Sequence, residues 1–214
     1  CDETGGDYYD FLESSDHQHG NFIAVVGDVS GHGIPSALIM ATARAFLRQR
    51  ASLPGTPAEI VSDVNRQMTR DFEESAGFMT LFYLCIHPAE KSLCWVRAGH
   101  DPAILYDPES DQFDELRGEG MALGVDADGR FEQFQKAGLK KGQIIIMGSD
   151  GLWEARNPQG EMFGKEPIQQ IIRQSPHATA RDILTSCFNR LKDFLEDHSP
   201  EDDVTLVVIK ITKD

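Results

Sequence analysis

The stretch FIAVVGDVSGHGIPSAL (residues 22–38) decides how the N-terminal part of this chain folds. The apolar run 22–26 has the composition of a buried strand. It leads directly into the glycine-rich segment 27–33, and a helical pattern from Pro35 to Ala51 follows. The glycines permit a sharp turn around Asp28. Three interpretations are open for this turn: a phosphate cradle, a metal-binding turn or a plain strand-to-helix connection.

The rest of the chain divides into helical and extended patterns that are joined by short turns. A second helix is predicted to begin at Thr56, because Thr-Pro-Ala-Glu (56–59) combines a capping residue, a first-turn proline and a well-placed glutamate. A later helix is predicted over about 179–195, with a further one before it. Strands are predicted at 8–12, 21–27, 79–86, 92–98, 103–107, 112–116, 143–148 and 204–211.

This order of patterns predicts an α+β fold rather than a regular βαβ alternation. We expect one domain over residues 1–214, built as a four-layer αββα sandwich with two central, mostly antiparallel sheets flanked by helix pairs. The chain starts with Cys1, and its first motif begins at Gly5. We therefore expect it to be one domain of a longer, multidomain regulatory protein.

Composition excludes several classes of function. The formal net charge of −15 argues against a nucleic-acid partner, which requires a basic face. No apolar stretch has the length needed to insert into a bilayer. The four cysteines show no CxxC spacing, and a reduced, cytoplasmic chain is expected, although Cys85 and Cys94 lie on adjacent predicted strands.

Several aspartates stand beside apolar strands, three of them next to glycine. Any one of them alone is more readily a turn residue, because its side chain bonds nearby backbone amides. Together, at the rims of a sandwich, they can converge, and converging carboxylates repel one another unless cations neutralise them. Mg²⁺ or Mn²⁺ suits such oxygen ligands, in a two-metal hydrolytic site. The candidates are Asp7, Asp28, Asp150, Asp202 and Asp203.

The same segments resemble a known family. They are similar, in order and over almost the whole chain, to the successive motifs of the SpoIIE/RsbU-type phosphatases, the bacterial branch of the PPM metal-dependent serine/threonine protein phosphatases. The segments are GGDYYD (5–10), GDVSGHGIPSAL (27–38), RAGHDPAIL (97–105), GSDGLWEA (148–155) and EDDVTLVVI (201–209).

The resemblance implies a site for two Mn²⁺ or Mg²⁺ ions. Asp7 would bind one ion, near the backbone carbonyl of Val29, and Asp28 would bridge both ions. Asp150 and either Asp202 or Asp203 would bind the other. Asp28 and Asp150 are therefore also the expected catalytic residues. The two ions would acidify a water molecule that attacks the phosphorus of phosphoserine or phosphothreonine without a covalent phosphoenzyme.

The resemblance also implies partners. The expected substrate is a phosphorylated regulatory protein, such as a STAS-type anti-sigma-factor antagonist in a bacterial stress response. Control by an upstream sensor or regulatory domain is expected, together with a possible homodimer and a cytoplasmic location, which includes the cytoplasmic part of a membrane-anchored protein. Two alternatives remain open: a catalytically inactive, PPM-like binding module, and a nucleotide-binding module, which Asp28 and the missing P-loop lysine disfavour.

Two departures from the wider family stand out. Where many eukaryotic relatives have a histidine two residues after the aspartate, this chain has Ser30, so a general-acid role does not transfer to His32. No arginine precedes Asp7 to bind phosphate. Arg44 and Arg97 are alternatives, but an exposed or ion-paired role is expected for each.

Overall fold

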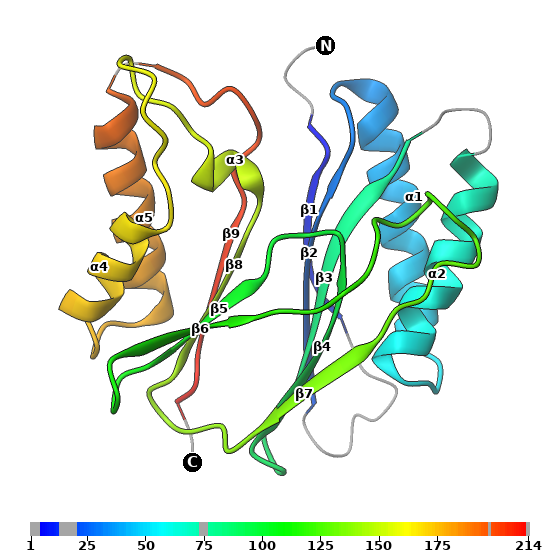
Figure 1. Cartoon of the computed structure of the whole chain (residues 1–214), viewed down its shortest axis with the longest axis horizontal. Coiled ribbons are helices and arrows are strands. Elements are labelled where there is room, and N and C mark those ends of the chain that lie inside the picture. The colour runs from blue at the N-terminus through cyan, green and yellow to red at the C-terminus, as the bar shows by residue number, and fades with distance from the viewer. Residues whose placement is uncertain (1–4, 13–20, 73–76, 197, 213–214) are drawn as a thin grey trace. The chain divides into compact units, whose positions relative to one another are not determined.

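The computed structural model describes residues 5–12, 21–72, 77–196 and 198–212, which form an α+β structure with two antiparallel sheets (Figure 1). The chain divides into two compact units, each with its own sheet, helices and core. Unit 1 comprises Cys1–Pro102 and Arg117–Leu139, and unit 2 comprises Ala103–Leu116 and Lys140–Asp214.

Unit 1 contains a five-stranded sheet with the strand order β1-β2-β3-β4-β7, in which every neighbouring pair is antiparallel. The strands are β1 Asp7–Leu12, β2 Phe22–Val29, β3 Met79–His87, β4 Ser92–Ala98 and β7 Gln133–Ala137. The first four agree with the predicted ranges to within two residues. The prediction did not single out β7, because its sequence QFQKA is mostly exposed and lacks an apolar alternation.

Two helices, α1 (Ile34–Ala51) and α2 (Pro57–Phe72), pack on one face of this sheet (Figure 1). The predicted capping box of α2 is present: the Glu59 carboxylate accepts from the Thr56 backbone N–H at 2.7 Å, and the Glu59 N–H donates to the Thr56 hydroxyl at 3.3 Å. Val61, Val64 and Met68 of α2 are buried in the core of unit 1. The apolar face of α2 therefore holds the helix against the strands.

Unit 2 contains a four-stranded antiparallel sheet with the order β6-β5-β8-β9. Its elements are β5 Ala103–Asp107, β6 Gln112–Leu116, β8 Ile144–Gly148, α3 Asp150–Trp153, α4 Glu166–Gln174, α5 Ala180–Leu195 and β9 Leu206–Lys210. The predicted strands are confirmed, with β9 shorter than expected. The four-residue helix α3 was not predicted, because so short a stretch shows no periodicity.

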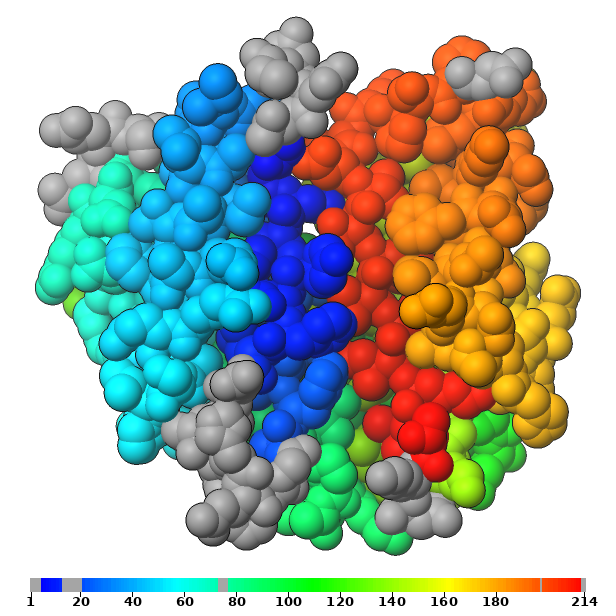
Figure 2. Space-filling model, turned by 180° about the vertical axis from the view of Figure 1, so that it is seen from behind, coloured from blue at the N-terminus to red at the C-terminus, as the bar shows by residue number. Residues whose placement is uncertain are grey.

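The core of unit 2 contains several aromatic and sulfur-containing side chains that stand out in the sequence. Strand β8 is buried along its whole length, as its continuous apolar run predicts. Trp153, Phe163 and Cys187 are all buried in this core, which makes packing their main role. Thr179 caps α5 through a capping box with Asp182, and α5 is seen in orange in Figure 2.

The predicted fold class is thus confirmed: α+β, with two antiparallel sheets and a helix pair packed in each unit. Across the residues that the structure describes, no helix combines the length and the apolar character needed to cross a membrane.

Candidate functional site

Two predicted ligands of unit 1 lie opposite each other on neighbouring strands. Asp7 opens β1, and its register partner on β2 is Asp28. Directly opposed residues of an antiparallel pair point to the same face of the sheet, with Cβ atoms about 4.5–5.5 Å apart. Like charges in such positions destabilise the sheet. The two carboxylates, both half-buried, therefore form a pair that a cation would stabilise.

Gly6 brings a third oxygen to this acidic pair. A Cβ at position 6 would lie only 2.3 Å from the Val29 carbonyl oxygen and 2.9 Å from Oδ1 of Asp28. The Val29 N–H also donates to the Gly6 carbonyl at 3.2 Å, which fixes this approach. Two of the predicted donors, the Asp28 carboxylate and the Val29 carbonyl, thus lie beside the same glycine, and only glycine leaves room for them.

The turn that follows Asp28 is held by the backbone. The Ser30 N–H donates to the Phe78 carbonyl at 2.9 Å, and the Ser30 hydroxyl accepts from the Phe78 N–H at 3.0 Å. Gly33 has a φ of 78°, a left-handed conformation that favours glycine, and it is the N-cap of α1. His32 is exposed on this turn. The glycines shape the connection, and the histidine does not belong to the core.

A threonine–histidine pair next to Asp28 was missed in the sequence. Thr80 of β3 is the register partner of Asp28, and its hydroxyl lies 2.8 Å from Nδ1 of His100. The His100 side chain is buried, and its carbonyl accepts from Arg97 Nε. This contact holds Thr80 in place on β3, the strand next to Asp28. His100 lies within the motif RAGHDPAIL (97–105), but only the strand register reveals its neighbour.

The two arginines considered for phosphate binding have structural contacts. Arg97 also donates through Nη1 to the Gly118 carbonyl at 3.0 Å, which connects β4 to the segment around Gly118. Nε of Arg44 lies 3.6 Å from the Asp10 carboxylate, which also receives Arg48. The Arg44 contact agrees with the ion-paired role that was expected for it, whereas Arg97 is half-buried and bonds backbone carbonyls instead.

In unit 2, the predicted ligands gather around Gly151. Asp150 follows β8, and its Oδ1 accepts from the Gly151 N–H at 2.9 Å. A Cβ at Gly151 would lie 2.1 Å from the Asp203 carbonyl oxygen and 3.3 Å from the Asp202 Cβ. Ser149 joins the same segments, since its N–H donates to the Thr205 carbonyl at 3.1 Å. The turn after β8 and the segment before β9 are thereby packed tightly together.

A cavity of about 300 Å³ lies over this contact. Its acidic lining comprises Asp150 and Asp202, both predicted, and two carboxylates that the sequence did not single out. Both predicted side chains are exposed, whereas Asp203 is half-buried and contributes its carbonyl to the packing. The remaining lining residues are Gly151, Glu154, Ala155, Arg156 and Glu201.

The donors in both groups suit a hard divalent cation. All are carboxylate or carbonyl oxygens, the ligands that Mg²⁺ and Mn²⁺ prefer, and no histidine or cysteine lies among them. Gly6 leaves open a space beside Asp28 and Val29 that any side chain would fill. The structure brings Asp7, Asp28 and Val29 together in unit 1, and Asp150 and Asp202 together in unit 2. The use of both groups in one centre stays a prediction.

The fold places this chain in a known structural class. It is similar to the SiaA-PP2C domain of Pseudomonas aeruginosa, with a TM-score of 0.82 and 23% identity, covering 97% of this chain and 81% of that one. It is also similar to RsbX, solved in complex with magnesium, with a TM-score of 0.68 and 18% identity over 95% of this chain and 86% of that one. These likenesses define a PP2C-type phosphatase fold.

The family follows from the sequence. Residues 18–212 match the family model described as "Stage II sporulation protein E (SpoIIE)", and the chain belongs to this family. The phosphoserine phosphatase RsbU of Bacillus subtilis (strain 168) is 28% identical over 211 residues, which is 97% of this chain. The chain spans 60% of the length of RsbU. The family predicted from the motifs is confirmed.

Proposed function

We propose that this chain is a metal-dependent phosphatase that hydrolyses phosphoserine or phosphothreonine on a regulatory partner protein. The observation that carries the proposal is the opposed pair Asp7 and Asp28 beside the Val29 carbonyl. Two like charges directly opposite each other destabilise the sheet, and a bound cation would remove this repulsion. The similarity to RsbU, a phosphoserine phosphatase, supports the choice of reaction.

The proposed metal ligands are carboxylates from both units. Asp7, Asp28 and the Val29 carbonyl would hold one Mn²⁺ or Mg²⁺ ion, and Asp150 with Asp202 would hold a second, with Asp28 serving both. Such ions acidify water and stabilise charge on phosphoryl oxygens. We choose Asp202 over Asp203 because the Asp202 side chain lines the acidic cavity, while the Asp203 carbonyl packs on Gly151.

The chain's own residues position these carboxylates. Asp28 lies between β1 and β3, where its strand is held on both sides, and the Thr80–His100 contact braces the neighbouring position. Asp150 is oriented by the Gly151 N–H. Fixed ligands of this kind need no reorganisation when a substrate arrives, which is the basis of electrostatic stabilisation in hydrolytic sites.

We further propose that the two units act as one phosphatase domain within a longer regulatory protein. The similarity to the SiaA-PP2C domain over 97% of this chain supports the first part, and the 60% share of RsbU supports the second. A STAS-type anti-sigma-factor antagonist is the proposed substrate, and an upstream sensor domain and a homodimer are proposed as means of control. A cytoplasmic location suits the thiols of Cys85, Cys94 and Cys187, all free in the structure.

The test is turnover of a phosphoserine peptide and of p-nitrophenyl phosphate by the purified chain. We expect activity with Mn²⁺ or Mg²⁺ and its loss in EDTA, with recovery when the metal is restored. Asp128→Asn, a change of an exposed aspartate outside both acidic groups, serves as the control and should keep full activity. Activity that is insensitive to EDTA would overturn the metal mechanism. A folded chain without turnover on any metal would instead favour the inactive binding module.

A further inference from the structure

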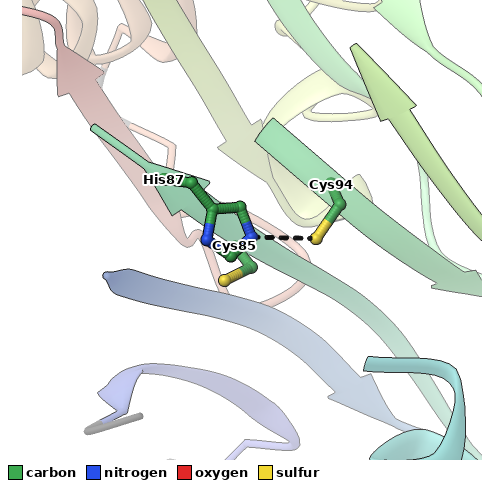
Figure 3. A group of neighbouring side chains, drawn as sticks. All are labelled: Cys85, His87 and Cys94. Carbon is green, nitrogen blue, oxygen red and sulfur yellow. Dashed lines mark hydrogen bonds between the residues drawn. The ribbon is translucent and has the colours of Figure 1, made fainter. Parts of the chain in front are cut away.

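A second cluster of metal-ligating side chains lies in unit 1, outside both acidic groups. Cys85 of β3 and Cys94 of β4 are register partners, and His87 follows Cys85 on the same face of β3 (Figure 3). One ligand atom from each residue, two sulfurs and one imidazole nitrogen, lies within 4.8 Å of the other two. The sequence showed only that the two cysteines stand on adjacent strands.

The spacing of these atoms matches that of a zinc site. Nε2 of His87 lies 3.5 Å from Sγ of Cys94 (Figure 3). Tetrahedral zinc, with Zn–S of about 2.3 Å and Zn–N of about 2.0–2.1 Å, places a sulfur and a nitrogen about 3.6 Å apart. The same distance suits a hydrogen bond between the thiol and the imidazole. When the thiol is deprotonated, a metal ion can take the place of the proton between the two atoms.

The electrostatic environment differs between the two thiols, and the thiolate is the form of cysteine that binds metals. A hydrogen bond with Cys85, and a further contribution from His87, lower the pKa of the Cys94 thiol against the opposing effect of burial. The pKa of its partner Cys85 is raised by the same hydrogen bond and by burial. The carboxylate of Glu90, in the turn between the two strands, raises the pKa of both thiols.

The two cysteines of the cluster are buried, and the histidine is partly exposed. Cys85 and Cys94 are only 5% and 4% exposed, whereas His87 is half-buried at the end of β3. Tyr83, on the same face of β3, is fully buried, and its hydroxyl has no hydrogen-bond partner among the described residues. Buried polar atoms of this kind are often satisfied by water or an ion. The sulfurs are thus shielded from solvent, and the imidazole is the ligand group nearest to it.

We propose that Cys85, His87 and Cys94 form a binding site for one zinc ion, with three protein ligands and a fourth position for water. Thiolate and imidazole select zinc over Mg²⁺ and Mn²⁺, the hard ions suited to the acidic groups. The site joins β3 to β4 at the end of β3 that lies opposite to Thr80, the register partner of Asp28. Its role is to stabilise this part of the sheet, and it does not depend on the proposed phosphatase activity.

The test uses cobalt as a spectroscopic substitute for zinc. The reduced, chelator-treated chain is titrated with Co²⁺, and the absorption from thiolate-to-cobalt charge transfer is followed. Carboxylate sites do not give this band, so the acidic groups do not interfere. We expect one equivalent of Co²⁺ to bind with the band, and Zn²⁺ but not Mg²⁺ to displace it. Absence of the band from the reduced, folded chain would overturn the proposal.

Variants assign the ligands. Cys94→Ser should abolish the band, and Cys187→Ser, a buried cysteine in the core of unit 2, should leave it unchanged. Because Cys94→Ser changes a buried position, His87→Gln provides a second variant at a half-buried one. It should weaken Co²⁺ binding at least about tenfold while circular dichroism shows an intact fold. A band that persists in Cys94→Ser would contradict the assignment, and so would an unchanged Co²⁺ affinity in His87→Gln. The assignment would also be wrong if Cys85 and Cys94 formed a disulfide and the reduced chain bound no metal at these residues.

Discussion

The region around the end of β2 in unit 1 and the turn after β8 in unit 2 both bring acidic oxygens close together, but they hold them in different ways. In each unit an aspartate lies at or just after the end of a buried strand, and a glycine, Gly6 in unit 1 and Gly151 in unit 2, packs against a backbone carbonyl. In unit 1 the crowded carbonyl, that of Val29, is itself a proposed metal ligand. In unit 2 the crowded carbonyl belongs to Asp203, and the carboxylates of Asp150 and Asp202 remain exposed in a cavity.

The difference indicates a division of roles. The donors of unit 1 are half-buried, partly backbone and fixed by strand register, so they can adapt little. Those of unit 2 are exposed side chains at the start of a four-residue helix and in the segment before β9. We infer that the metal ligands proposed in unit 1 are rigidly held and that those proposed in unit 2 can adapt more readily.

The largest expected effect is that of removing either central carboxylate. Asp28→Asn should lower kcat by about 1000-fold or more, since several kcal/mol of metal-derived stabilisation are lost. Asp150→Asn should lower kcat by a similar or smaller factor. Added Mn²⁺ should partly restore the activity, because an exposed ligand is more easily replaced by water. Initial rates on p-nitrophenyl phosphate across a Mn²⁺ titration check both variants. Equal rescue of the two would remove the distinction between them.

The second effect concerns the two crowded glycines. Gly6→Ala should reduce activity about 100-fold, because its Cβ would displace both the Val29 carbonyl and the Asp28 carboxylate. Gly151→Ala should destabilise unit 2 by about 1–3 kcal/mol through its clash with the Asp203 carbonyl, and lower activity less. Activity and thermal unfolding are measured for both. Gly31→Ala, where φ is 93° and the space is open, controls for backbone strain alone.

Much of the fold could be predicted because local chemistry agrees with the final structure. The Thr56 capping box, the apolar runs of β3 and β4 and the glycines around Asp28 all act through neighbours in the sequence. The exceptions are instructive. Strand β7 pairs with β4 through its backbone, although its side chains carry no strand pattern.

The site could be predicted only in part, because its geometry depends on register. The sequence identified Asp7 and Asp28, but it could not show that they face each other, or that His100 contacts the next strand through Thr80. Register is set by the whole sheet and leaves no local signal. The same holds for Cys85 and Cys94, whose exact pairing determines whether their sulfurs meet.

A third prediction separates two neighbouring aspartates in unit 2. Asp202→Asn should raise the Mn²⁺ concentration required for half-maximal activity more than tenfold, because its side chain lines the cavity with Asp150. Asp203→Asn keeps the carbonyl that packs on Gly151, and its effect should be several-fold smaller. The reverse order would assign Asp203 as the ligand. The comparison would then change, because a half-buried side chain would hold the metal in unit 2 as in unit 1.

The smallest effect tests why the unit 1 turn is rigid. Three residues after Asp7, the Asp10 carboxylate accepts from Arg48 Nε at 2.6 Å and from the Tyr8 hydroxyl at 3.0 Å, which ties β1 to α1. Burial raises the pKa of Asp10, but these hydrogen bonds outweigh it and the pKa is lowered overall. Asp10→Asn should therefore destabilise the chain by about 2 kcal/mol, less than for a fully buried ion pair because Arg48 is half-exposed.

The pH dependence of this loss identifies its cause. A carboxyl group whose pKa is lower in the folded state contributes its full stability above its unfolded pKa of about 3.9, and loses it as the pH falls through the folded value. The gap in unfolding free energy between the wild type and Asp10→Asn should be constant from pH 7 to about pH 5 and shrink below about pH 4. Urea unfolding at a series of pH values measures it, with Asp128→Asn as the exposed control. A gap that persists undiminished at acid pH would mean that packing, and not the ionised Asp10, anchors β1 beside Asp28.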